Sequence, residues 1–233
     1  MSAARYPPLG MLGPRAIASW ALRARVDALQ VDGVDGVPRA GPVLLVARHY
    51  HHLLDGAVLI RAVPRPVHVV VALDWAANAV QRRVMETACA WAHWPVIVRP
   101  ALADAGGAFA AHELSRRLRR GLGHAADLLA AGRVVAVFPE GRPAIDRAVD
   151  TSTVARVPLP ARDAAGFLPF ARGFTTIVRL AARRGAGDVA IVPVGFTYAR
   201  SGRRWRVAVR FGATLPSDAA APDVERAVRA LSA

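Results

Sequence analysis

Short apolar runs alternate with longer segments of helical spacing along this chain, and this alternation constrains its fold more than any other feature. The runs at 42–47, 134–138 and 189–194 each read as a buried strand. Between them, apolar residues recur with the spacing of helices. Strands that alternate with helices are typical of a parallel sheet. We therefore expect an α/β fold: a single domain with a mostly parallel mixed sheet flanked by helices.

The remaining segments complete this pattern. Further strands are expected at 67–73, 95–98 and 204–211, and the last of them alternates sides as an edge strand does. Helices are expected at 52–63, 75–91, 112–131, 174–184 and 221–231. The stretch from 142 to 166 is irregular, and loops of this length in compact domains are usually functional or disordered.

The N-terminal part has a character of its own. Residues 14–29 read as an amphipathic helix, in which Ile17 and Trp20 are apolar and Arg15 and Arg23 carry charge. Such a helix can lie in a membrane interface or pack on the domain. We divide the chain into an N-terminal amphipathic segment, residues 1–30, and a domain of residues 31–233.

The net charge of +14 narrows the class of partner. All 31 basic residues are arginine, whose planar fork donates two hydrogen bonds to a phosphate at once. Nucleic acid, an anionic membrane and a phosphorylated substrate all fit this charge.

No apolar run reaches the ~18 residues of a membrane-spanning helix, and we expect no secretory signal. The single cysteine, Cys89, excludes an intramolecular disulfide and fits a reducing cytoplasm.

Three polar residues, His49, Arg99 and Glu140, each come directly after a predicted strand. Functional sites of parallel sheets lie beyond the carboxyl ends of the strands. We therefore expect one crevice to collect the three side chains.

The histidines near Asp55 indicate general-base chemistry. An acid beside an imidazole fixes its tautomer and stabilises the imidazolium. Such a histidine can deprotonate a hydroxyl that attacks an acyl carbonyl or thioester. His51 and Asp55 are four residues apart and would share a helix face, whereas His49 can reach Asp55 by folding over the first turn. A solvated histidine cluster at a helix start is the non-catalytic alternative.

A metal site is a second alternative for the same stretch. The pattern His-x-His-x-Asp-His is the zinc signature of metallo-β-lactamase-like hydrolases. His49 and His51 match it, but Leu53 and Leu54 occupy its acid and final histidine positions. We therefore expect no metal here.

Two further motifs lie downstream. Phe138–Arg142 reads Phe-Pro-Glu-Gly-Arg and places a carboxylate and a glycine just after a buried strand. In Val192–Val194 a proline interrupts an apolar strand, which indicates a sheet edge, a bulge or a pocket wall.

In their order, these motifs resemble the glycerophosphate and lysophosphatidate acyltransferase family. That family has a His-x4-Asp block after a strand, a second block ending in arginine, a third reading Phe-Pro-Glu-Gly and a fourth reading Val-Pro-Val. The corresponding segments here are residues 41–46 before the histidines, Val96–Arg99, Phe138–Gly141 and Val192–Val194, with 168–173 similar to the family's segment between the last two blocks. The resemblance runs from about Val34 to Tyr198.

The resemblance implies an enzyme of phospholipid biosynthesis, an acyltransferase like those that act on 1-acylglycerol-3-phosphate. The acyl donor would be acyl-CoA or acyl-carrier protein, and the acceptor a lysophospholipid or glycerol phosphate. His49 would be the base and Asp55 would orient it. Arg99, Glu140 and Gly141 would hold the acceptor, and Arg142 would be a phosphate ligand. No cofactor and no nucleic acid are expected, and the positive charge would hold the enzyme at the cytoplasmic face of the cell membrane.

The sequence departs from the family at the histidine itself. The family spacing would put the histidine at position 50, which is Tyr50, and Arg48 replaces the family's asparagine. We favour His49 because it follows the strand, with a one-residue bulge before Asp55. His51 and His52 are the alternatives, as is a degenerate site in a non-catalytic basic protein that binds lipid or nucleic acid.

Overall fold

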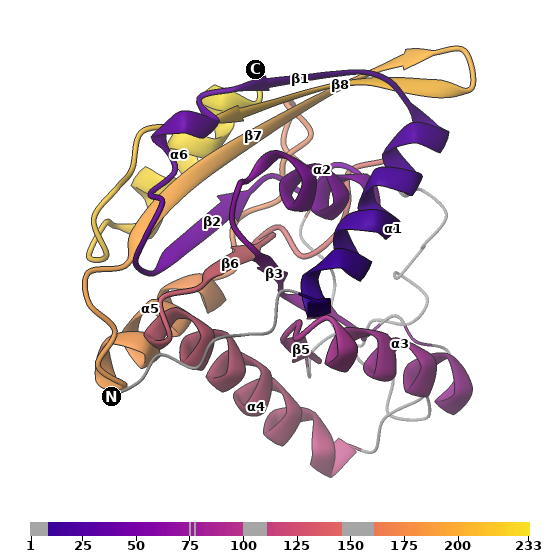
Figure 1. Cartoon of the computed structure of the whole chain (residues 1–233). Coiled ribbons are helices and arrows are strands. Elements are labelled where there is room, and N and C mark those ends of the chain that lie inside the picture. Colours follow the sequence, from indigo (N-terminus) through magenta and orange to yellow (C-terminus); the bar gives the residue numbers. More distant parts are fainter. Residues whose placement is uncertain (1–8, 75, 77, 100–110, 146–160) are drawn as a thin grey trace.

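The computed structural model describes residues 9–74, 76, 78–99, 111–145 and 161–233 (Figure 1). The helices are α1 (Leu9–Arg25), α2 (Leu54–Ala62), α3 (Ala79–Trp91), α4 (Ala111–Ala130), α5 (Gly173–Arg183), α6 (Ala221–Leu231) and the short 3-10 helix η1 (Val34–Gly36). The strands are β1 (Val26–Asp32), β2 (Val43–Ala47), β3 (Val67–Val69), β4 (Val71–Ala72), β5 (Val96–Ile97), β6 (Val134–Val137), β7 (Ala190–Ser201) and β8 (Arg204–Phe211).

Six of these strands form one mixed sheet in the order β1-β8-β7-β2-β6-β3. Within it, β7 and β8 pair antiparallel, and every other neighbouring pair is parallel. β2 lies near the middle of the sheet and all its residues are buried, as its continuous apolar run predicts. The α/β fold with a mostly parallel mixed sheet is therefore confirmed.

Helices cover both faces of the sheet. Alternate residues of β2 enter different cores, because successive strand side chains point to opposite faces. Val43 and Leu45 pack with α1 and α2. Leu44 and Val46 pack with α4, α5 and α6. Figure 1 shows α2 and α1 on one side of the sheet and the α4–α5 pair on the other. The β2–α2 connection that carries the histidines thus leaves the centre of this three-layered structure.

A second, two-stranded sheet consists of β4 and β5, which pair in parallel. It forms a small core with Leu73, Val98 and Leu114. α4 lies directly against it, since a side chain at Gly121 would collide with the backbone of Val96. The expected strand at 67–73 is therefore divided between two sheets, and Arg99 follows the end of β5 in the smaller one.

Two expectations about strands and helices are wrong. The helix expected at 14–29 ends at Arg25, and Val26–Asp32 forms β1, which pairs with β8 along its length. Because β1 covers β8, the strand at 204–211 is internal and not an edge. Sequence cannot distinguish the two for 26–29, because Val26, Ala28 and Leu29 with one acid, Asp27, suit the end of an amphipathic helix as well as an edge strand.

The strand with Pro193 is also internal, so the sheet-edge alternative for this proline is wrong. The Pro193 carbonyl accepts a hydrogen bond from the Gly212 N–H, just past the last β7–β8 pair, Val194 with Phe211. The nitrogen of Pro193, which has no hydrogen, faces the same side as its carbonyl. The missing donor therefore falls where the pairing with β8 ends.

The buried His68 of β3 leads to a prediction about acid stability. Its ring is 1% exposed, and its Nδ1 lies 3.0 Å from the His93 carbonyl. Burial lowers the pKa of His68 from 6.5 to about 4, so the folded state holds the neutral ring. Stability is therefore lost as the pH falls from about 6.5 towards 4, by roughly 3 kcal/mol in full.

Urea unfolding of the wild type and His68→Gln at pH 7 and pH 4 measures this loss. The wild type should lose roughly 3 kcal/mol more than the variant between the two pH values. His52→Gln, at an exposed histidine, should lose as much as the wild type. Equal losses in His68→Gln and the wild type would contradict the assignment.

Candidate active site

His49 and Asp55 are joined by a hydrogen bond at the carboxyl end of β2. His49 Nδ1 lies 2.9 Å from Asp55 Oδ2. A carboxylate oxygen only accepts, so Nδ1 carries a hydrogen, and in the neutral ring Nε2 is then the nitrogen with a lone pair. The Asp55 side chain is 0% exposed, whereas that of His49 is 16% exposed. The buried acid therefore orients an imidazole that solvent can still reach.

The backbone before α2 absorbs the extra residue between His49 and Asp55. The N–H groups of Tyr50 and His51 donate to Asp55 Oδ2 at 2.7 and 2.9 Å. The chain thus wraps around the carboxylate, as expected of a one-residue bulge. His51 Nδ1 accepts from the N–H groups of Leu53 and Leu54, at the start of α2. His52 is exposed to solvent.

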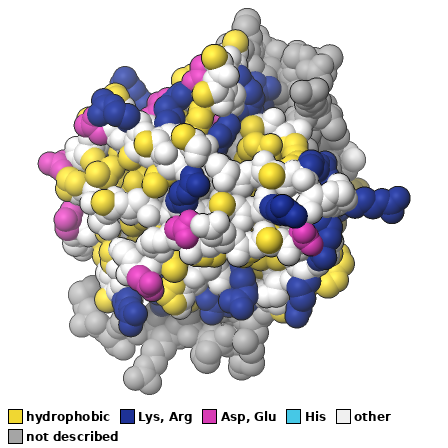
Figure 2. Space-filling model, turned by 90° about the horizontal axis from the view of Figure 1, so that it is seen from above, with side chains coloured by type: hydrophobic (Ala, Val, Ile, Leu, Met, Phe, Trp, Pro, Cys, Tyr) yellow, Lys and Arg dark blue, Asp and Glu magenta, His cyan; other side chains and the backbone are white. Residues whose placement is uncertain are grey.

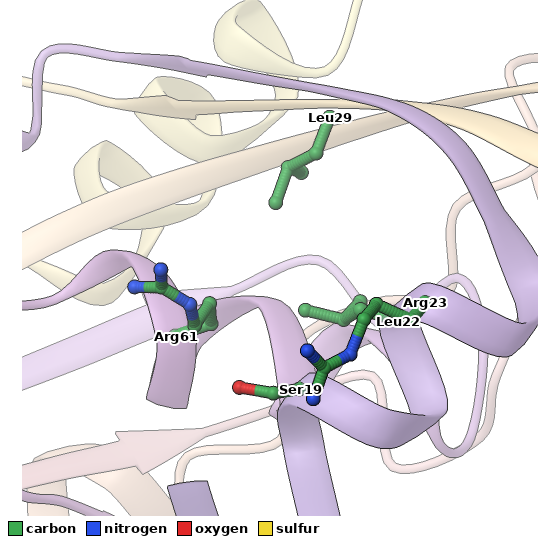
Figure 3. A pocket seen from close by; sticks show the side chains of 5 residues that line it. All are labelled: Ser19, Leu22, Arg23, Leu29 and Arg61. Atoms are coloured by element: carbon green, nitrogen blue, oxygen red, sulfur yellow. The ribbon is translucent and has the colours of Figure 1, made fainter. Parts of the chain in front are cut away.

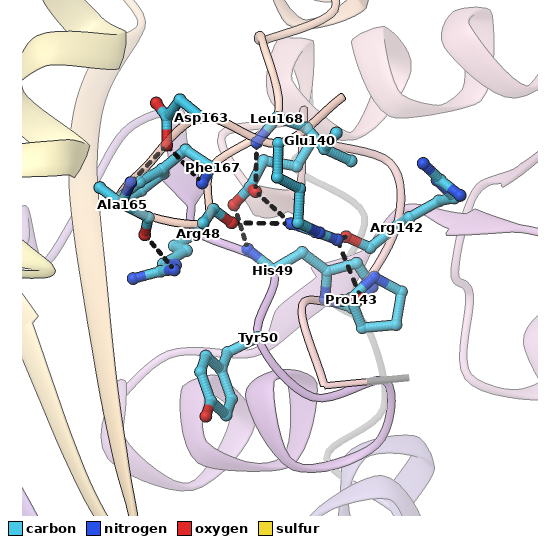
Figure 4. A network of polar contacts seen from close by, with 12 residues as sticks. Arg48, His49, Tyr50, Glu140, Arg142, Pro143, Asp163, Ala165, Phe167 and Leu168 are labelled. Carbon is cyan, nitrogen blue, oxygen red and sulfur yellow. Dashed lines mark hydrogen bonds and ion pairs between the residues drawn. The ribbon is translucent and has the colours of Figure 1, made fainter. Parts of the chain in front are cut away.

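Glu140 holds the backbone of His49 in place. It follows β6, the parallel neighbour of β2, so the two strand ends bring the residues together. Glu140 Oε1 accepts the His49 N–H at 3.0 Å, and Oε2 accepts the Leu168 N–H at 3.1 Å (Figure 4). Burial raises the pKa of the Glu140 carboxyl, and these two hydrogen bonds oppose the shift.

Arg162 completes this network, and sequence reasoning missed it. Its Nη1 lies 3.4 Å from Glu140 Oε2 and donates to the Gly166 carbonyl at 2.9 Å. Its Nη2 donates to the carbonyls of Arg142 and Pro143 at 3.3 and 3.1 Å. Arg162 lies in an irregular stretch, where no periodicity or motif singles it out. One guanidinium thus ties the Phe-Pro-Glu-Gly segment to the chain before α5.

Arg99 lies against the same segment from the side of the small sheet. Its guanidinium is paired with Asp74, with Nη2 2.5 Å from Oδ2 and Nε 3.2 Å from Oδ1. Gly141 has a φ of +71°, and a Cβ at this position would collide with Arg99 Nη1. Only glycine fits this left-handed, closely approached position without strain. The three strand ends therefore meet, as the positions of His49, Arg99 and Glu140 predict.

The other predicted residues take different positions. The side chain of Arg142 points away from His49 and Glu140 in Figure 4. Arg48, which replaces the family's asparagine, has its guanidinium 3.9 Å from the centre of the Phe167 ring. Its Nη2 lies 3.4 Å from the Ala165 carbonyl. The His49 ring itself stacks on Phe138, with ring centres 4.6 Å apart. That Arg99, Glu140, Gly141 and Arg142 bind a substrate stays a prediction.

A surface cavity of about 300 Å³ lies elsewhere, between α1, β1 and α2. Figure 3 shows its lining residues: Ser19, Leu22, Arg23, Leu29 and Arg61. None of the predicted site residues lines it. Among the described residues, no three histidine, cysteine or acidic side chains are grouped so as to hold a metal ion.

Comparison with known proteins identifies the family and a similar fold. The model of the family described as Acyltransferase matches residues 28–197, which is most of the chain. The fold is similar to the crystal structure of the 1-acyl-sn-glycerophosphate (LPA) acyltransferase PlsC from Thermotoga maritima, with a TM-score of 0.55 and 12% identity over 94% of this chain and 77% of that one. No curated protein matches the sequence. With its sequence motifs, its fold and the family match in agreement, the chain belongs to the Acyltransferase family.

Proposed function

We propose that this protein transfers a fatty acyl group from a thioester donor to a hydroxyl of a lysophospholipid or glycerol-phosphate-like acceptor. His49 Nε2 takes the proton of the acceptor hydroxyl, and the oxygen attacks the thioester carbonyl. The C–S bond then breaks, the thiolate of the donor leaves and takes the proton from the His49 imidazolium, and the ester forms without a cofactor. Asp55 stabilises the imidazolium that exists between the two proton transfers.

The hydrogen bond between His49 and Asp55 is the observation that carries this proposal. It places a hydrogen on Nδ1, so that in the neutral ring Nε2 is the nitrogen that can take a proton, and the side chain is partly open to solvent, as a general base requires. The backbone of the base is held by Glu140 and by the start of α2, so its position is preorganised. The family match supports acyl transfer as the reaction class.

A phosphorylated acceptor fits the charges around the site. Arg99 is partly exposed next to Gly141, and its charge lies beside the segment that holds His49. Arginine binds phosphate through two parallel hydrogen bonds. The name of the similar Thermotoga enzyme specifies an acylglycerophosphate, which supports the same acceptor class.

The test is acyl transfer by the purified protein. Palmitoyl-CoA and palmitoyl-carrier protein are each incubated with lysophosphatidate, and the ester product and released thiol are measured. Product with either donor supports the proposal and identifies the donor. No product with either donor, across several acyl chain lengths, contradicts it. Vesicle binding without turnover would then favour a non-catalytic lipid-binding protein.

We also propose that the enzyme works at the cytoplasmic face of the cell membrane, on anionic lipid. Among the described helices, none is long and apolar enough to cross a bilayer. The proposal is supported by α1, which exposes Ile17 and Trp20, with 56% and 68% of their surface accessible. Three residues apart, they share one side of the helix. Figure 2 shows arginine side chains, with several acidic ones among them, between apolar patches on one face of the molecule. The net charge of +14 suits an anionic surface.

Trp20→Glu should weaken this binding by roughly tenfold or more, because a charge replaces the apolar side chain that enters the interface. Sedimentation with vesicles of phosphatidylglycerol and phosphatidylcholine measures it. Ala182→Glu on α5 changes the net charge equally at another exposed position and should have a much smaller effect. Equal effects of the two substitutions would refute the assignment to α1.

A further inference from the structure

Tyr198 lies on β7, the strand next to β2, and its side chain contacts the buried aspartate of the site. Its hydroxyl donates to Asp55 Oδ1 with an oxygen–oxygen distance of 2.5 Å. The two residues are 143 positions apart in the chain. Tyr198 lies outside the four sequence motifs, since the Val-Pro-Val motif ends at Val194.

The two oxygens of Asp55 are used differently. Oδ2 accepts hydrogen bonds from His49 Nδ1 and from the N–H groups of Tyr50 and His51. Among the described residues, the donor to Oδ1 is Tyr198 alone. Because Asp55 is 0% exposed, bulk solvent does not reach this oxygen. The tyrosine hydroxyl therefore determines whether the second oxygen of a buried carboxylate is satisfied.

The surroundings of Tyr198 suit a fixed donor. Its ring stacks on the Tyr50 ring, with centres 4.5 Å apart and planes 6° from parallel. The Trp205 ring meets it edge-on, with centres 5.8 Å apart. Burial, and then the neighbouring Asp55 charge, raises the pKa of the Tyr198 hydroxyl well above its ordinary value. The hydroxyl thus keeps its proton at neutral pH, and packing holds its direction.

We propose that Tyr198 is a positioning residue of the active site, which fixes the Asp55 carboxylate and thereby the orientation of the His49 imidazole. The carboxylate would otherwise rotate to satisfy Oδ1, and its hydrogen bond to His49 would weaken. Three elements then hold the base: the end of β2, the start of α2 and the middle of β7.

Tyr198→Phe tests the proposal, because it removes the hydroxyl and keeps the ring contacts with Tyr50 and Trp205. We expect kcat to fall roughly tenfold or more, with KM for both substrates nearly unchanged. Ser201→Ala is the matched control. It removes another hydroxyl–aspartate hydrogen bond from the same strand, Ser201 to Asp27, away from the site. It should leave kcat at the wild-type value.

The kinetic readout rests on the proposed acyl transfer, so a second readout does not use activity. The Nδ1 proton of His49, shared with a carboxylate, should give a strongly downfield proton NMR resonance, assigned by its loss in His49→Ala. In Tyr198→Phe this resonance should move upfield or disappear, and in Ser201→Ala it should stay. Lack of turnover in the wild type would overturn the proposed function and leave this test intact. An unchanged resonance with wild-type kcat in Tyr198→Phe, whatever its melting temperature, would overturn the role of Tyr198.

Discussion

His49→Ala should lower kcat for acyl transfer by roughly a hundredfold to ten-thousandfold, because general-base catalysis by a positioned side chain contributes about this much. The His49 ring packs on Phe138 at a partly exposed site, so its loss should leave the fold intact. Product formation from acyl thioester and lysophosphatidate measures the effect. Circular dichroism and thermal unfolding verify that the variant is folded.

Two further variants make this prediction specific. Asp55→Asn should also lose most activity, since an amide can present its N–H to His49 Nδ1 and can no longer stabilise an imidazolium. His52→Ala removes an exposed histidine three residues away and should retain wild-type kcat. Wild-type kcat in His49→Ala would contradict the proposed role of His49 as the general base. A loss confined to His52→Ala would transfer the role of base to that residue.

Glu140→Gln should destabilise the protein by about 3 kcal/mol, despite its nearly identical shape. Both carboxylate oxygens of Glu140 face donors: the His49 N–H on one, and Leu168 and Arg162 on the other. A glutamine must direct its NH₂ at one of these donors in either orientation. The Arg162 guanidinium also loses its charged partner. Urea unfolding at pH 7 measures the change, and kcat should fall with it because the backbone of His49 is released.

Glu86→Gln is the matched control for this substitution. Glu86 forms a partly exposed ion pair with Arg117 between α3 and α4. The chemical change is identical, but solvent screens the pair, so the expected loss is below about 1 kcal/mol. Similar stability of Glu140→Gln and Glu86→Gln would contradict the view that the buried Glu140 carboxylate stabilises the fold through its hydrogen bonds to His49, Leu168 and Arg162.

Local patterns predicted those elements that depend on short-range signals. β8 and α6 have the expected bounds, 204–211 and 221–231, because each shows a clear period between turn residues. The meeting of His49 and Glu140 also follows from sequence, since a parallel sheet brings its strand ends to one edge, whereas Arg99 approaches Gly141 from the second sheet, which the sequence did not indicate. The family resemblance, based on short motifs in order, is confirmed by the family match.

Features that depend on long-range packing were not predictable. Nothing in residues 26–32 indicates that they pair with a strand some 180 residues further along the chain. Arg162 and Tyr198 are ordinary residues in their local surroundings, and only tertiary contacts bring them to Glu140 and Asp55. The spacing between His49 and Asp55 likewise has meaning only once the backbone of Tyr50 and His51 is seen around the carboxylate.

The pairing of β1 with β8 has a consequence for how the protein is made. Val26 pairs with Trp205, so β1 finds its partner only after some 180 further residues have been made. Until then β1 is an unpaired edge, which can pair with other chains. The same delay applies to Asp55, whose tyrosine donor is also made late. Such distant contacts slow folding, and a nascent chain of this kind can hold Asp55 between both sets of donors only after β7 has been made.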